Sequence, residues 1–283
     1  MIYLISAILF GSLFAVLFKI FAQKGVNTMQ AIIFNYVTAI LIGPLSDIIQ
    51  GQIPFNSFNS FNSIPLLPAA LTGVFMVGGF LFMSNTTKSH GVAIATIATR
   101  VSFIIPTICA YLFLGEKNIE LQTSLMVIIA LILIFYTKDK HGVNIKKWYN
   151  PVLVFLCYGC ANFLLKYCQS NVSGNSALLA LTTITFTSAL ILSIILAYTQ
   201  KGNRNGFKWS NLLAGVVLGI CNISCTYFLL KALTHYSTAI FYPTYNISIV
   251  ILGILAGRIL FRERLNTLQI IGVLIAILAI LFV

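Results

Sequence analysis

The sequence has very little charge and almost no acid. Only 8% of its 283 residues are charged and 59% are hydrophobic, and just five residues are Asp or Glu. Because ordinary water-soluble domains have about 25% charged residues, this composition excludes a soluble globular fold. A bilayer core about 30 Å thick requires about 20 apolar residues per helix, so a chain of this length with short connections has room for roughly ten spans.

Motifs for several kinds of chemistry are also absent from the sequence. There is no G-x-x-x-x-G-K-[ST] loop, so ATP is not the direct energy source, and an ion gradient or substrate exchange must drive any transport. No H-E-x-x-H motif and no Ser-His pair on one predicted helix is present, which leaves an intramembrane enzyme as a weaker alternative. A membrane scaffold or sensor without transport activity is a third alternative.

The basic residues indicate the partners of the chain. The formal net charge is +12, but the Lys and Arg residues are scattered at the ends of apolar runs and form no continuous patch, which argues against nucleic acid. No cofactor or metal site is predicted. The expected partners are membrane lipids, a small-molecule substrate and a coupling ion that the sequence does not identify.

Long apolar runs between Gly, Pro, Asn and charged residues predict an all-α integral membrane protein with ten transmembrane helices. The predicted spans are 2–22, 29–50, 65–87, 92–114, 120–137, 150–168, 176–199, 210–231, 237–260 and 267–283.

A fixed offset of 147 residues (263 minus 116) relates the two halves of the chain. It aligns Lys19 with Lys166, Glu116 with Glu263, and Gln122 with Gln269. The halves are predicted to be two five-helix repeats, 1–140 and 141–283. Because five is odd, the second repeat enters the membrane from the opposite side, which gives the inverted repeats common in secondary transporters.

The distribution of Lys and Arg predicts an orientation. Leaving Arg100 aside, thirteen of these residues lie at the connections on one side of the membrane and three on the other. By the positive-inside rule the first side is cytoplasmic, which places both termini outside.

Several short motifs point to a family. They are Pro106, Leu114-Gly115-Glu116, Gln122, Phe261-Arg262-Glu263, Gln269 and Gly272. With these motifs the chain resembles the drug/metabolite transporter superfamily, in particular its EamA-type members with ten helices. The resemblance implies two bundles around a central cavity, and transport of metabolites or drugs. It also implies cytoplasmic termini, opposite to the charge distribution, so both orientations stay open.

One basic residue lies deep in a predicted span, whereas all five acids lie at or near span ends. The lack of a central carboxylate argues against a cationic cargo, because charges inside the membrane are retained mainly for function. Arg100 lies about 12–13 Å into the helix that is predicted to begin near Val92. Its planar fork of donors suits carboxylate or phosphate, so we predict that it binds an anionic group of the cargo. The alternative is a structural arginine held by helix-end carbonyls or by an internal carboxylate.

Other polar residues recur at helical spacing and complete the predicted binding site. The candidates on the fourth and ninth predicted helices are Thr96, Arg100, Thr107 and Tyr111, and Tyr242, Tyr245 and Asn246 beside Pro243. The remaining candidates are Lys19, Lys166, Asn162 and Asn222. Ordinary interhelical hydrogen bonding is the alternative for the neutral residues, and snorkelling to the headgroups is the alternative for the two lysines.

Pairs of glycines spaced four apart predict close helix packing. Gly215 with Gly219, and Gly253 with Gly257, are read as packing seams rather than as contacts to a cargo. Taken together, the residues predict a secondary carrier that moves a small anionic or zwitterionic metabolite across the cytoplasmic membrane by alternating access.

Overall fold

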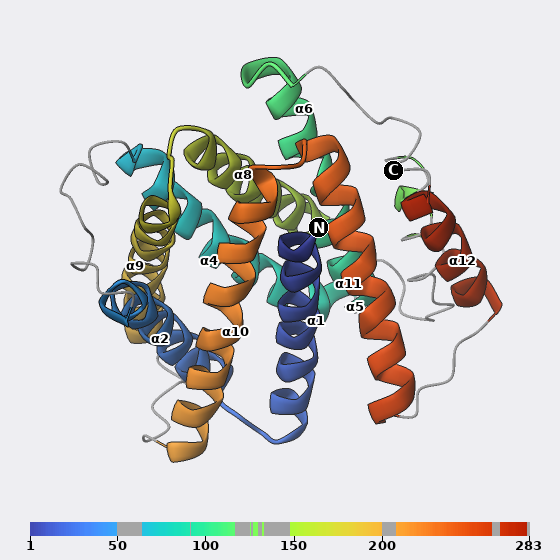
Figure 1. The fold of residues 1–283 in the computed structure, drawn as a ribbon. Coiled ribbons are helices and arrows are strands. Elements are labelled where there is room, and N and C mark those ends of the chain that lie inside the picture. Colours follow the sequence, from blue (N-terminus) through green and yellow to red (C-terminus); the bar gives the residue numbers. More distant parts are fainter. Residues whose placement is uncertain are drawn as a thin grey trace. The chain divides into compact units, whose positions relative to one another are not determined.

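The computed structural model describes residues 1–49, 64–90, 92–116, 125, 127–129, 132, 148–199, 208–261 and 267–281. These residues form helices and no strand (Figure 1). In chain order the helices are α1 (Ile2–Gln23), α2 (Thr28–Ile49), α4 (Leu66–His90), α5 (Val92–Val101), α6 (Ile104–Phe113), α8 (Tyr149–Ser170), α9 (Asn175–Thr199), α10 (Trp209–Leu233), α11 (Thr238–Phe261) and α12 (Thr267–Leu281).

Length and composition identify membrane-spanning segments among these helices. Six stretches are long and apolar enough to cross a bilayer: Leu66–Thr87, Ile94–Phe113, Tyr149–Ser170, Asn175–Thr199, Trp209–Leu233 and Thr238–Leu260. Two shorter apolar helical segments lie in α1 and α2. The chain is therefore a membrane protein with several spans. Ten spans and the inverted repeat stay predictions, and most of the predicted span 120–137 lies outside the described residues.

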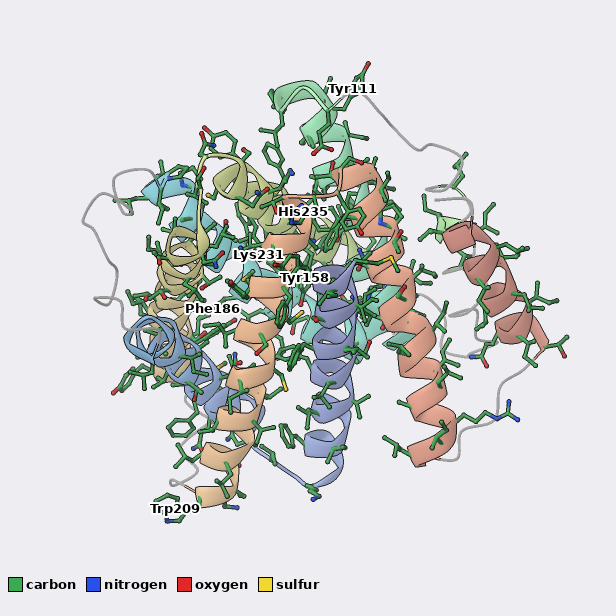
Figure 2. All side chains as sticks on the ribbon, viewed as in Figure 1. Tyr111, Tyr158, Phe186, Trp209, Lys231 and His235 are labelled. Atoms are coloured by element: carbon green, nitrogen blue, oxygen red, sulfur yellow. The ribbon has the colours of Figure 1, made fainter. Side chains whose placement is uncertain are left out.

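Aromatic residues at helix ends agree with a membrane location. Trp148, Tyr198 and Trp209 are 64%, 86% and 71% exposed, and they lie beside the start of α8, at the end of α9 and at the start of α10. Figure 2 shows Trp209 at one end of α10 and Lys231 towards the other. Trp and Tyr are enriched where a span meets the headgroup region, because their rings are apolar and also carry a polar group.

The helices group into two compact units, each drawn from both halves of the chain. Unit 1 comprises Met1–Val77 and Leu164–His235, and unit 2 comprises Gly78–Phe163 and Tyr236–Val283. The division falls inside α4 and α8. The units therefore differ from the predicted repeats, 1–140 and 141–283, whose relation by inversion stays a prediction.

In unit 1, α2 and α10 pack closely against each other at two glycines of α10. A Cβ atom at Gly215 would lie 2.3 Å from Cβ of Phe34, and one at Gly219 would lie 2.6 Å from Cβ of Thr38. This confirms the predicted packing seam at Gly215 and Gly219. At Gly253 a Cβ would have no described neighbour within 4 Å, so the structure gives no such support to the second glycine pair.

Side-chain amides hold the same two helices together. Asn211 of α10 donates from Nδ2 to Oε1 of Gln30 at 2.6 Å, and its Oδ1 accepts from the backbone N–H of Asn27 at 3.1 Å. Further along, Asn222 Nδ2 donates to Asn35 Oδ1 at 3.2 Å. Amide hydrogen bonds between apolar helices fix their register, because each buried polar group requires a partner.

The predicted span 92–114 is interrupted, since α5 ends at Val101 and α6 begins at Ile104. Pro106 has no N–H, so it cannot donate to the carbonyl four residues earlier, at Ser102. That carbonyl accepts instead from the N–H of Ile105 at 3.1 Å. The tighter turn interrupts the helix just after Arg100.

Candidate functional site

One face of α11 carries polar side chains on three successive turns. Thr238, Tyr242 and Asn246 are spaced four apart, so they lie on the same side of this helix. We call these three residues the polar face of α11. All three are less than 9% exposed, and each contacts a different segment of unit 2.

The first contact of this face joins α11 to α5. Arg100 Nη1 donates to Oδ1 of Asn246 at 3.2 Å. The amide is itself oriented, because its Nδ2 donates to the backbone carbonyl of Tyr242 at 2.9 Å. Arg100 lies in the last turn of α5, where the partial negative charge of a helix end stabilises a cation. The guanidinium is therefore held by an amide and by its position in α5.

The second contact joins α11 to α8 through a backbone atom. Tyr242 is 1% exposed, and its hydroxyl donates to the carbonyl oxygen of Asn162 at 3.0 Å. Asn162 was predicted to contribute its side chain, whereas this contact uses its main chain. One turn away, the ring of Tyr245 stacks on Phe241 with centroids 5.3 Å apart. α11 continues through Pro243 as one helix.

The third contact involves Glu116, which was not predicted to be part of the site. Glu116 follows the end of α6, and its Oε2 accepts from the backbone N–H of Thr238 at 2.8 Å and from the Thr238 hydroxyl at 2.5 Å. The signal for it in the sequence was the Gly115-Glu116 pair after an apolar helix. Its partner lies 122 residues away in the chain, so no local pattern could reveal the pairing.

The other candidates of the fourth predicted helix are not part of these contacts. Thr107 is buried in α6, and its hydroxyl donates to the carbonyl of Phe103 in the preceding turn at 2.9 Å. Tyr111 is 46% exposed, and Figure 2 shows its ring directed away from α6. Thr96 is half-buried in α5, one turn before Arg100. The predicted polar stripe required one continuous helix. Because the helix is interrupted before α6, helical spacing no longer places Thr107 and Tyr111 on the same face as Arg100.

Three further candidates lie in unit 1. Lys166 is 8% exposed, and its Nζ donates to the carbonyl of Leu233, the last residue of α10, at 3.0 Å. Its ammonium is therefore buried at a helix C-terminus, which favours cations, and does not extend outward as a snorkelling lysine would. Asn222 contacts Asn35, as described above. Lys19 lies in α1, but its side chain is outside the described part of the structure.

The contacts of α11 provide binding groups rather than reactive ones. They are an oriented guanidinium, a primary amide, a phenol hydroxyl and a carboxylate. Among the residues that the structure describes, no three His, Cys, Asp or Glu side chains come together as metal ligands would. Of these groups, a guanidinium that is oriented by an amide suits the polar group of a solute.

Comparisons with known proteins show which fold and which family the chain resembles. Over its whole length it is similar to a protein of known crystal structure, with a TM-score of 0.75 and 13% identity, covering 99% of this chain and 94% of that one. This likeness shows the fold alone. An uncharacterized protein of Haemophilus influenzae is 29% identical over 290 residues, which cover 98% of this chain and 95% of that protein. The EamA-like transporter family matches residues 150–283. Residues 150–283 therefore resemble the drug/metabolite transporter superfamily, to which the EamA-like transporter family belongs.

Proposed function

We propose that this membrane protein is a secondary carrier for a small anionic or zwitterionic metabolite, and that Arg100 binds the negatively charged group of its cargo. The match of residues 150–283 to the EamA-like transporter family supports transport as the activity. The observation that supports an anion is the hydrogen bond of 3.2 Å from Arg100 to Asn246, which orients a guanidinium within the helices of unit 2.

The partner of Arg100 in this bond is neutral. An amide oxygen fixes the direction of the guanidinium but adds no negative charge, and arginine stays protonated in proteins. A cation inside a span is costly, so it is retained mainly where it serves a substrate pathway. A cationic cargo would meet the same cost and would require a negative partner inside the membrane. It is disfavoured, because no Asp or Glu occupies the middle of a predicted span.

The interruption of the helix beside Arg100 also supports a substrate site at this residue. In many secondary carriers the substrate site is formed by discontinuous helices, whose free backbone groups lie near the middle of the membrane. Here α5 ends at Val101, one residue after Arg100, and α6 begins at Ile104.

Alternating access by two inverted five-helix repeats is the mechanism that we propose for this carrier. The offset of 147 residues between the halves (263 minus 116) supports it, since inverted repeats can exchange conformations across the membrane. An ion gradient or the exchange of one solute for another would supply the energy. The cytoplasmic membrane is the proposed location.

Uptake into liposomes tests this proposal. The purified chain is reconstituted and supplied with a panel of radiolabelled solutes, namely the anions lactate and glycerol 3-phosphate and the zwitterion alanine, with choline as the cationic control. The wild type is compared with Arg100→Ala, Arg100→Lys and Arg258→Ala. Arg258 is the matched control, because it is exposed near the end of α11 in the same unit and its replacement removes the same charge.

We expect the wild type to carry at least one solute of the panel, each of which has a negatively charged group, and to exclude choline. A hydrogen bond to a charged group contributes about 1.5–3 kcal/mol, so Arg100→Ala should raise the KM for the carried solute roughly 10- to 150-fold. The KM of Arg100→Lys should lie between those of the wild type and Arg100→Ala, because lysine keeps the charge but not the planar fork. Equal uptake of every panel member by Arg100→Ala and Arg258→Ala would refute the proposal.

A further inference from the structure

The end of α6 brings a carboxylate to the start of another helix. Gly115 has a φ of +70°, a left-handed conformation that glycine adopts without a side-chain clash. The N–H of Glu116 then donates back to the carbonyl of Ala110 at 3.3 Å, which folds the chain over the last turn of α6. Glu116 is thereby held directly beyond that helix.

Its carboxylate occupies the N-terminus of α11. Thr238 is the first residue of α11 and is fully buried, and both its N–H and its hydroxyl donate to Glu116 Oε2. The first N–H groups of a helix have no acceptor within the helix, and a negative charge is favoured there by the helix dipole. The Glu116 carboxylate therefore satisfies a buried donor and matches the local charge.

This contact belongs to the same face as the site. Thr238 lies two turns before Asn246 on the polar face of α11, a distance of about 12 Å at 1.5 Å per residue. A helix fixed at its first residue can neither fray nor rotate freely there. The position of the Asn246 amide opposite Arg100 thus depends on how firmly the start of α11 is held.

We infer that Glu116 is a positioning residue of the transport site, which acts on the cargo only through α11 by holding Tyr242 and Asn246 in place. The inference rests on the proposed function of Arg100. Glu116 contacts α11 at Thr238, two turns before the residue that contacts Arg100, and it is not expected to touch the cargo.

Uptake kinetics with Glu116→Ala, Glu116→Gln and Asn246→Ala test the inference, using whichever solute of the lactate, alanine and glycerol 3-phosphate panel the wild type carries. Loss of a buried acceptor predicts that Glu116→Ala raises the KM about tenfold. Glu116→Gln should stay near the wild type, because glutamine keeps an acceptor oxygen of the same reach. In the Asn246→Ala background, Glu116→Ala should change KM no further, while it lowers the melting temperature in both backgrounds.

The double variant separates positioning from a general structural role. If Glu116→Ala raises KM equally in both backgrounds, or in neither, the inference is overturned. Backbone hydrogen exchange provides a readout that does not depend on transport. Faster exchange over residues 238–246 in Glu116→Ala, but not in Glu116→Gln, is expected even if Arg100→Ala leaves uptake unchanged and the proposed function fails. Unchanged exchange over these residues would overturn the inference alone.

Discussion

Replacing Gly215 with alanine should loosen the helix pair α2 and α10. The added Cβ would lie 2.3 Å from Cβ of Phe34 and 2.8 Å from the carbonyl oxygen of Ala31. Carbon atoms pack best at about 3.5–4.0 Å, so the first contact is more than 1 Å too short. Neither neighbouring atom can move by a side-chain rotation, because one is a Cβ and the other belongs to the backbone. The two helices would have to separate.

The expected magnitude follows from two opposing effects. Overpacking a tight contact destabilises by about 1–3 kcal/mol, and the clash at Gly215 belongs at the upper end because separation also strains the bond from Asn211 to Gln30. Replacing glycine by alanine inside a helix stabilises by about 0.8–1.0 kcal/mol. The net loss is about 2 kcal/mol, which corresponds to a melting temperature lower by about 4–8 °C in a chain of this size.

Thermal unfolding of the purified protein in one detergent measures this effect, with the monodisperse fraction after heating as the readout. Gly253→Ala is the matched control, because it makes the same change in α11 at a position where no described atom lies within 4 Å of the new Cβ. It should be as stable as the wild type or slightly more stable. If Gly215→Ala and Gly253→Ala melted at the same temperature, the close approach of α2 and α10 would be refuted.

Two further predictions concern buried hydrogen bonds. Tyr242→Phe removes the hydroxyl that donates to the Asn162 carbonyl at 3.0 Å, and the loss of one such bond should destabilise the chain by about 0.5–1.5 kcal/mol; an unchanged melting temperature would contradict this. Asn211→Ala removes two hydrogen bonds of a side chain that is 1% exposed, so the loss of stability should be larger, about 1–3 kcal/mol. A smaller effect for Asn211→Ala than for Tyr242→Phe in the same assay would show that the contacts between α2 and α10 are weak.

Much of the helical framework could be predicted from apolar runs. The predicted spans 176–199 and 237–260 agree with α9 and α11 to within a residue at each end. Apolar stretches in a membrane protein are bounded by the bilayer itself, so their ends are marked by polar and charged residues. The interruption of 92–114 was not predicted, although Pro106 was noted, because a proline in a span can also be accommodated without a break, as Pro243 is in α11.

The candidate site was predicted only where helical spacing decided it. Tyr242 and Asn246 were recognised as neighbours on one helix, and Arg100 was recognised as a cation within a span. Their contacts to other segments depend on tertiary packing, which a helical wheel does not contain. The use of the Asn162 main chain is the clearest case, because a backbone carbonyl is present at every residue and leaves no mark in the sequence.

The pair α2 and α10 and the polar face of α11 are held by contacts of physically different kinds. In unit 1 the seam of α2 and α10 brings backbone and Cβ atoms together at Gly215 and Gly219, and such close-packed contacts do not deform gradually. The polar face of α11 is held by three polar contacts, with a net contribution of about 0.5–1.5 kcal/mol for the neutral contact of Tyr242 and about 1.5–3 kcal/mol for each contact of Arg100 or Glu116. The states of a switching protein differ by a few kcal/mol, so contacts of this strength can be exchanged for contacts with a cargo. We therefore expect α11, and not the pair α2 and α10, to be the helix whose hydrogen exchange changes when a carried anion is added.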